Sequence, residues 1–563
     1  MTRSSGWGTR IDQQPAGHPG GRRRTPGPGP RPVAGLTPAH AAVLTALIIG
    51  LWSCGGPEGA PVDRPLVLGY SAELQTLNPV LSTDQNANEL IYYLLYTPLV
   101  VYDSTFEVRP WLAESWELDE TGVTFQLRRD VRWHDGQPVT AEDVAFTFEL
   151  ATDPEVASPL GAAYLQGVAS AEVRGPHVVR FEFAVPHARP LEDFFWPPVP
   201  KHLLADVPSA ELITHPFNRA PVGSGPYRFL SWRVNEALSF EAAGGFPQAL
   251  GGDPEIARVI YRIVPERTTL LAELLSGGVQ VDGPLSPADA ARVEADPATE
   301  LRAFPWRQFT YIGWNTRREP FTQPAVRRAL AMAVDREELL AAVLHGYGTL
   351  ATDPIPPWHP YASGLEPLPY SPDSAAAMLD RAGWRDLDSD GVRERDGVPL
   401  RFTMLASQRN PVFGDLVQVI QSQLAAVGVQ MEPRLLEWQT VLGMHRARDF
   451  DAVLTNWVMD NFRVDPRPLF HGSQVGVEGS ANRSAYADAE ADRLMDSGAS
   501  TLDDDEARRI WREFAEIIQR DQPVLFLFWN DEMAGVRAEL EGVRMDARGE
   551  LATLPRWRWR AAP

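Results

Sequence analysis

The sequence predicts an α/β protein that is built from more than one lobe. Strand-like runs alternate with segments whose apolar residues recur at helical spacing, and turns rich in Pro and Gly separate them. About 510 residues follow an apolar N-terminal segment, which is enough for two to four domains. Hydrophobic residues make up 44% of the chain and supply material for large cores.

Individual elements can be placed along the chain in order. Runs rich in β-branched and aromatic residues predict strands, and apolar positions three or four residues apart predict helices. Thr140 and Asp143 resemble a capping box that opens a helix through Leu150. The predicted strands are Pro65–Ser71, Val178–Phe183, Arg258–Val264, Val429–Leu435 and Val524–Trp529, and the other predicted helices cover residues 326–334, 335–345, 415–427 and 510–518.

The N-terminal segment has the composition of a secretory signal. Ala41–Leu51 is too short to span a membrane, and arginines precede it. Leu51-Trp52-Ser53-Cys54 resembles a bacterial lipobox, which predicts a signal over residues 1–54 and lipidation of Cys54. A plain signal peptide with an incidental cysteine is the alternative. Residues 55–64 form a Gly/Pro linker.

Composition excludes several classes of function. The net charge of −22 argues against nucleic-acid binding, which needs clustered cations. Cys54 is the only cysteine and Lys201 the only lysine, so the chain has neither an internal disulfide nor a Gly-Lys-Ser/Thr nucleotide loop. The histidines form no His-x-x-x-His pair, and no hydrolase nucleophile motif is present. We therefore expect no metal, no cofactor and no enzymatic activity.

A multi-part motif pattern covers about residues 66–550. Its segments are Pro110–Trp116, Phe125–Arg129, Val131–Val144, Pro221–Tyr227, Trp314–Thr316, Pro320–Phe321, Val326–Leu330, Ala382–Trp384, Phe450–Ala452 and Ser480–Asn482. This pattern resembles the signature of the extracellular solute-binding proteins of family 5, which are the dipeptide-, oligopeptide- and nickel-binding lipoproteins of ATP-binding-cassette (ABC) importers.

The resemblance implies a periplasmic-binding-protein-like type II fold. Such a cluster C protein has three α/β lobes, and ligand lies in a hinged cleft between the first and the third. The implied segments are 65–82, 211–305 and 524–563 for lobe I, 83–210 for lobe II and 306–523 for lobe III.

The resemblance also implies ligand-binding residues. Trp457 and Asp460 match a Trp-x-x-Asp motif whose carboxylate binds a peptide's terminal ammonium, with Asn461 next to it. Trp438 matches an aromatic residue that lines the cleft, and Arg409 matches a segment that binds the ligand carboxylate. The alternatives are that Asp460 caps a turn and that Trp457 packs in the core.

Two polar motifs are expected to form turns. His134-Asp135-Gly136 has turn chemistry, with a catalytic His/Asp pair as the alternative. Residues 386–390 resemble the start of a calcium loop, but Gly397 stands where the bidentate Glu belongs. A solvated turn is therefore favoured there over a calcium site.

Taken together, the N-terminal segment and the resemblance imply an exported, lipid-anchored, monomeric receptor. It would bind short peptides and deliver them to ABC permease and ATPase subunits, from the outer face of the membrane or the periplasm. The alternatives are an oligosaccharide or other non-peptide ligand, a sensor or chaperone-like role, and an exported hydrolase.

Overall fold

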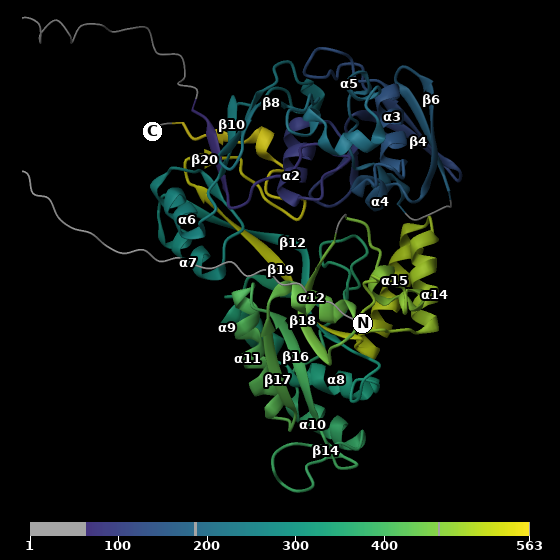
Figure 1. Ribbon diagram of the computed structural model, residues 1–563, viewed down its shortest axis with the longest axis vertical. Coiled ribbons are helices and arrows are strands. Elements are labelled where there is room, and N and C mark those ends of the chain that lie inside the picture. Colours follow the sequence, from purple (N-terminus) through teal and green to yellow (C-terminus); the bar gives the residue numbers. More distant parts are fainter. Residues whose placement is uncertain (1–63, 185–188, 460–461, 562–563) are drawn as a thin grey trace, which may run out of the picture. The chain divides into compact units, whose positions relative to one another are not determined.

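The structure is a computed structural model that describes residues 64–184, 189–459 and 462–561. Its largest sheet has eleven strands, and the predicted strand segments all belong to this sheet except the one at residues 178–183. Across the sheet, the strands are β17 (Gln430–Leu436), β16 (Arg401–Ser407), β18 (Ala452–Val458), β12 (Thr299–Trp314), β19 (Val524–Arg537), β11 (Val281–Asp282), β1 (Leu66–Tyr70), β10 (Arg258–Ile263), β9 (Ala237–Ala242) and β8 (Tyr227–Arg233), while β13 (Gly348–Leu350) pairs with β19 (Figure 1).

Two long antiparallel strands, β12 and β19, connect the two ends of this sheet (Figure 1). Residues 299–305 of β12 pair with residues 531–537, next to β11, whereas residues 309–313 pair with residues 524–529, next to β18. The register shifts between Pro305 and Phe309, which marks a bulge where the ladder is interrupted. We call the part with β1 and β8–β11 the β1 half, and the part with β13 and β16–β18 the β16 half.

The β1 half also contains a separate antiparallel sheet. Its core is continuous with that of the main sheet, because one hydrophobic cluster extends from Leu66 through Phe125 to Trp557. The second sheet has the order β4 (Ala113–Asp119), β5 (Gly122–Leu127), β7 (Val178–Phe183) and β6 (Val168–Gly175), and the small pairs are β2 (Val100–Tyr102) with β3 (Val108–Pro110) and β20 (Leu540–Glu541) with β21 (Arg558–Trp559).

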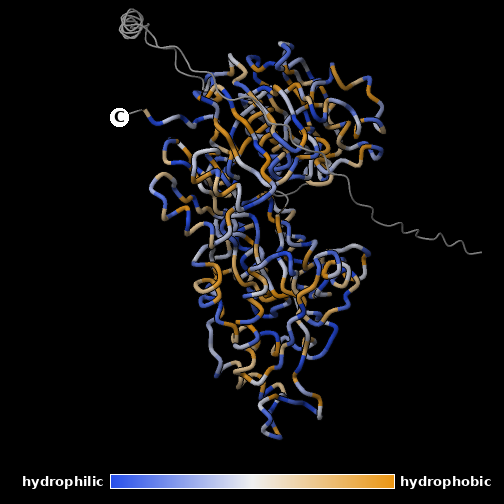
Figure 2. Tube along the Cα trace, turned by 60° about the vertical axis from the view of Figure 1, so that its left-hand side comes forward, coloured by the Kyte–Doolittle hydropathy of each residue, from blue (hydrophilic) through white to orange (hydrophobic). Residues whose placement is uncertain are grey.

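The β16 half has a hydrophobic cluster on each face of its strands. One cluster contains Trp314 and Ile420, and the other contains Phe309 and Trp511. Apolar and hydrophilic stretches alternate along the trace in Figure 2, as expected where elements bury only one face. The helices of this half are α8 (Pro324–Ala333), α9 (Arg336–Val343), α10 (Pro372–Arg381), α11 (Pro411–Ala425), α12 (Trp438–Arg446), α13 (Arg467–Phe470), α14 (Ala489–Ser500) and α15 (Asp504–Asp521), and β14 (Glu394–Arg395) pairs with β15 (Val398–Pro399).

Helix starts follow the local side-chain chemistry. The predicted capping box is confirmed, because Thr140 and Asp143 exchange hydrogen bonds at the start of α3. The start predicted near Asp415 is wrong by four residues, since Asn410 caps the helix and Pro411 occupies its first position. The remaining helices are α2 (Gln85–Glu89), the π-helical η1 (Leu90–Leu95), α3 (Ala141–Thr152), α4 (Pro159–Tyr164), α5 (Lys201–Leu204), α6 (Arg267–Ser276) and α7 (Pro287–Ala295), with short 3₁₀ segments at Pro190–Phe194, Ser209–Thr214, Pro216–Asn218, Gln248–Leu250, Gly472–Gln474 and Leu554–Arg556.

The Pro221–Tyr227 motif packs against η1, and its glycines are required by that contact. A Cβ atom on Gly223 would lie 1.9 Å from the carbonyl oxygen of Leu95. The His134 Nε2 atom lies 3.0 Å from the Gly225 carbonyl oxygen, and burial lowers the pKa of this histidine to about 4. The observed role of His134 is therefore structural, as the turn interpretation expects. The lobe boundaries given above stay predictions.

Candidate functional site

A cavity of about 430 Å³ lies beside the strands that join the two halves. Arg307 lines it from the bulge of β12, and Val458 and Met459 line it from the end of β18. This volume is in the range of small-ligand pockets. The β1 half contributes the other lining residues, apart from Phe462, and they are Pro79, Ser82, Thr83, Gln85, Asn88, Glu89, Tyr92, Tyr93, Pro159, Leu160, Ala162, Ala163, Tyr164, Phe195 and Arg548.

Arg307 is the cation that the β12 bulge presents to this cavity. Its guanidinium lies 5.1 Å from the ring centroid of Trp306 and 4.7 Å from that of Phe462. Its Nε atom is buried without a hydrogen-bond partner, and within the described part of the chain Arg307 forms no ion pair. Arg548 differs, because its guanidinium pairs with Asp546 at 2.7 Å.

Three glutamates cluster at the cavity: Glu89 lines it, and Glu532 and Glu550 interact with Glu89 through their charges. Burial is the main cause that raises the pKa of Glu89 to about 8 and the pKa of Glu550 to about 7, and it also raises the pKa of Glu532. The neighbouring carboxylates act in the same direction on Glu89 and Glu532, because like charges disfavour ionisation. Burial and mutual proximity therefore favour the protonated form of these groups.

Two of these glutamates have fixed partners within the β1 half. The Glu89 Oε2 atom accepts a hydrogen bond from the Leu551 backbone at 2.7 Å, and the Tyr70 hydroxyl donates to the Glu550 Oε2 atom at 2.9 Å. Gly549 makes the first contact possible, since a Cβ atom there would lie 2.5 Å from the Glu89 carboxyl group. Glu89 is thus hydrogen-bonded to the C-terminal segment, and Arg307 acts on it through charge, which lowers its pKa.

Aromatic rings and one ion pair connect the two halves near the cavity. Phe462 packs edge-on against Tyr102, with ring centroids 4.9 Å apart, and against Phe195. Next to it, the Arg463 Nη1 atom lies 2.8 Å from the Asp193 Oδ1 atom. These contacts hold the segment after β18 against the β1 half.

The predicted ligand-binding residues occupy different environments. Asp460, Asn461 and the lipidation candidate Cys54 lie outside the described residues. Trp457 is half-buried on β18 opposite Phe309, and it packs against the hydrophobic cluster on that face.

Trp438 and Arg409 are not brought to the cavity lining. Trp438 is the half-buried first residue of α12, and Arg409 is exposed just before α11.

The sequence analysis did not predict four charged residues of this region, which are Arg307, Glu89, Glu532 and Glu550. A polar run inside an apolar strand, as at residues 530–532 or 307–308, is the signal that could have indicated them.

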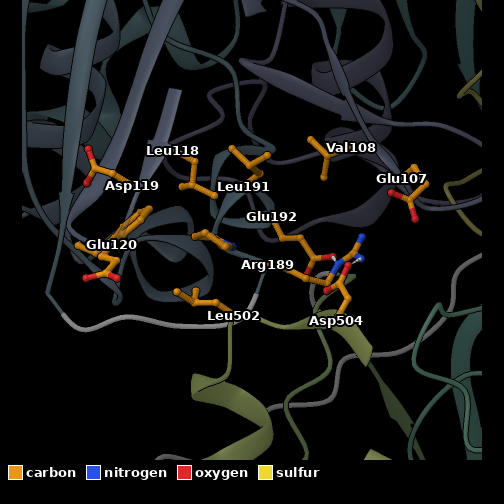
Figure 3. A pocket seen from close by; sticks show the side chains of 12 residues that line it. Glu107, Val108, Leu118, Asp119, Glu120, Arg189, Leu191, Glu192, Leu502 and Asp504 are labelled. Atoms are coloured by element: carbon orange, nitrogen blue, oxygen red, sulfur yellow. Dashed lines mark hydrogen bonds and ion pairs between the residues drawn. The ribbon is translucent and has the colours of Figure 1, made fainter. Parts of the chain in front are cut away.

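A second cavity of about 480 Å³ lies beside the start of α15 (Figure 3). Leu118, Leu191 and Leu502 form its apolar part, and its arginine faces two acids in the close-up. The Arg189 Nε atom pairs with Glu192 at 2.5 Å, and its Nη1 atom lies 3.8 Å from Asp504. The arginine of this cavity is therefore neutralised within the protein.

The acidic loop at residues 386–390 forms the expected turn. The Asp386 Oδ1 atom accepts a hydrogen bond from the Ser389 backbone at 2.7 Å. Asp386, Asp388 and Glu394 bring one carboxylate oxygen each to within 4.8 Å of one another, and both aspartates are exposed. The turn is closed by its own backbone groups.

A ligand-sized cavity between two halves that β12 and β19 connect is the arrangement of a hinged binding protein. Residues 107–476 match the model of the bacterial extracellular solute-binding proteins, family 5. The chain belongs to this family, as its motif pattern predicted.

In the part of the chain that the structure describes, no helix has the length and apolar character needed to cross a membrane.

Named relatives extend over almost the whole chain. The chain is 29% identical to the oligopeptide-binding protein AppA of Bacillus subtilis, over 92% of this chain and 97% of that one. It is 27% identical to the dipeptide-binding protein of Escherichia coli, over 86% and 93%. The solved structure of AppA from Bacillus subtilis with a nonapeptide matches with a TM-score of 0.70, over 89% of this chain and 99% of that one. This likeness confirms the predicted type II fold.

Proposed function

We propose that this protein is the exported receptor of an ABC importer and that it binds peptides in the 430 Å³ cavity. The observation that carries the proposal is the position of this cavity, between the two halves of a family 5 solute-binding protein. The names of its relatives support peptides as the ligand class. Delivery to permease and ATPase subunits, anchoring through Cys54 and the absence of enzymatic activity are parts of this proposal.

Asp460 is proposed to bind the peptide's terminal ammonium. The support is its match to the Trp-x-x-Asp motif and the fact that Val458 and Met459, directly before it, line the cavity. A buried ammonium needs an anionic partner, which a carboxylate supplies. Trp457 and Asn461 flank this group, while Trp438 and Arg409 would contact only a ligand that extends beyond the cavity.

The test uses an equimolar mixture of synthetic peptides of two to nine residues, each in a free form and an N-acetylated form. The protein is incubated with the mixture and separated from unbound peptide, and retained peptides are counted by mass spectrometry. We expect intact free peptides to be retained and acetylated copies to be depleted about 30-fold or more. Retention of no peptide in either form would contradict peptide binding and favour a ligand without an amine, such as an oligosaccharide.

Two variants assign the ammonium contact. Asp460→Asn should lose the preference for free over acetylated peptides, because both changes remove the same interaction. Asp415→Asn is the matched control, since Asp415 is an exposed carboxylate on α11 outside the cavity lining. A preference that survives Asp460→Asn would assign the ammonium to another group.

A further inference from the structure

The cations near the cavity differ in whether the protein itself neutralises them. Arg548 pairs with Asp546 at 2.7 Å, and Arg463 pairs with Asp193 at 2.8 Å. Arg307 has no such partner among the described residues, although it lines the cavity and its Nε atom is buried. A positive group that is partly removed from water and lacks a counter-ion favours an anion from outside.

The buried glutamates near Arg307 do not form an ion pair with it among the described residues. Glu89 accepts a hydrogen bond from the Leu551 backbone, and Glu550 accepts one from Tyr70. Arg307 lowers the pKa of Glu89 and of Glu532 through its charge, but burial acts more strongly and raises both pKa values. No described carboxylate is therefore in direct contact with the guanidinium of Arg307.

The surroundings of Arg307 also hold its backbone and its guanidinium in place. The Met459 backbone donates a hydrogen bond to the Arg307 carbonyl at 2.9 Å, which holds the bulge in place. The rings of Trp306 and Phe462 lie within stacking range of the guanidinium. Contact with the face of a guanidinium leaves its edge uncovered, and for Arg307 the two Nη groups of this edge, unlike the buried Nε, can meet the oxygens of a carboxylate.

We propose that Arg307 binds a carboxylate group of the peptide ligand. This inference rests on the proposed function and narrows the class of ligands. The ligands are peptides that have a free C-terminal carboxylate or an acidic side chain. When the halves close and water leaves the cavity, the pair becomes strong and its loss costly. Arg307 thus takes the role that the sequence assigned to Arg409.

The test adds two forms to the peptide mixture. Each peptide is supplied with a C-terminal amide, and each acidic peptide is also supplied with Asp and Glu replaced by Asn and Gln. Wild-type protein should deplete one of these forms about 30-fold or more relative to the free acid. Depletion of the amides identifies the C-terminal carboxylate, and depletion of the neutral side-chain forms identifies an acidic side chain.

Variants at Arg307 complete the test. Arg307→Gln should abolish the discrimination, and Arg307→Lys, which keeps the charge but not the planar fork, should retain part of it. Arg302→Gln is the matched control, because Arg302 lies on the same strand, pairs with Glu300 and is outside the cavity lining. Circular dichroism and a melting curve establish that each variant is folded.

The inference is overturned if wild-type protein retains free, amidated and neutralised peptides equally, or if Arg307→Gln discriminates as wild type does. In both cases, the retention of free peptides relative to N-acetylated peptides still tests the proposed peptide binding independently of Arg307. If peptides are retained equally well with and without their carboxylates, the proposed receptor function still holds and only the proposed role of Arg307 is wrong. Retention of no peptide would overturn both.

Discussion

The two cavities have similar volumes, about 430 and 480 Å³, but they differ in how their arginines are neutralised. In the cavity of Figure 3, Arg189 pairs with Glu192 and approaches Asp504. In the cavity beside the connecting strands, Arg307 has aromatic neighbours and no ion pair within the described ranges. The difference teaches that cavities of similar size can differ in their charges, and on this difference we base the proposal that the second cavity binds ligand.

The largest expected effect on stability comes from breaking the paired arginine. Arg189→Gln leaves Glu192, which is buried, without its cation, and removing one partner of a buried pair costs about 3 kcal/mol. The free energy of unfolding, measured by urea denaturation, should fall by this amount. An unchanged midpoint would show that the two cavities do not differ in the way described.

The buried glutamates should make stability depend on pH. Burial raises the pKa of Glu89 from an ordinary 4.5 to about 8, so the folded chain holds the proton more tightly than the unfolded chain. Its contribution to stability is complete below pH 4.5 and is lost as the pH rises to about 8. Glu89→Gln keeps an acceptor for the Leu551 backbone but cannot ionise.

We expect Glu89→Gln to reduce the loss of unfolding free energy between pH 5 and pH 8 by about 2 kcal/mol. Melting temperatures across this range measure the effect. Glu114→Gln, at an exposed position on β4, is the control and should follow the wild-type profile. If Glu89→Gln loses as much stability as wild type, the glutamate is already ionised in the folded protein.

Removing the unpaired arginine should have a smaller effect on stability. Arg307→Gln leaves no buried carboxylate without its partner, so the free energy of unfolding should change by less than about 1 kcal/mol. The measurement is the same urea denaturation as for Arg189→Gln. A loss as large as that of Arg189→Gln would indicate that Arg307 has a structural role.

The smallest effect is expected at the apolar rim of the cavity in Figure 3. Leu502 is 55% exposed, so Leu502→Ser should change the free energy of unfolding by less than about 0.5 kcal/mol. Peptide retention should stay at the wild-type level. A loss of retained peptide would assign ligand contacts to this cavity as well.

Much of the fold can be predicted from local sequence patterns. The strand predicted at Val178–Phe183 has the observed bounds, and the capping box at Thr140 begins α3. Strand β19 extends eight residues past its predicted end, because the polar run after Trp529 resembles a loop. Pairing with β12 satisfies the backbone of that run, and such long-range pairing leaves no local signal.

The candidate site was less predictable than the fold. Motif resemblance pointed to the end of β18, and Val458 and Met459 do line the cavity there. Arg307 could not be found in this way, because its orientation depends on a bulge whose register only the partner strand defines. The glutamates behind it come from α2, β19 and the C-terminal segment, so their proximity is a product of the tertiary structure.

The bulge in β12 places Arg307 on one of the two strands that connect the halves, and the proposed closure would turn the halves about these strands. When two bodies rotate about a hinge, points close to the axis travel short arcs, while points far from it travel long ones. In the proposed closure, an arginine on the connecting strands would present much the same edge to solvent before and after the movement. A ligand carboxylate would then dock there first, and the rest of the peptide would be enclosed afterwards.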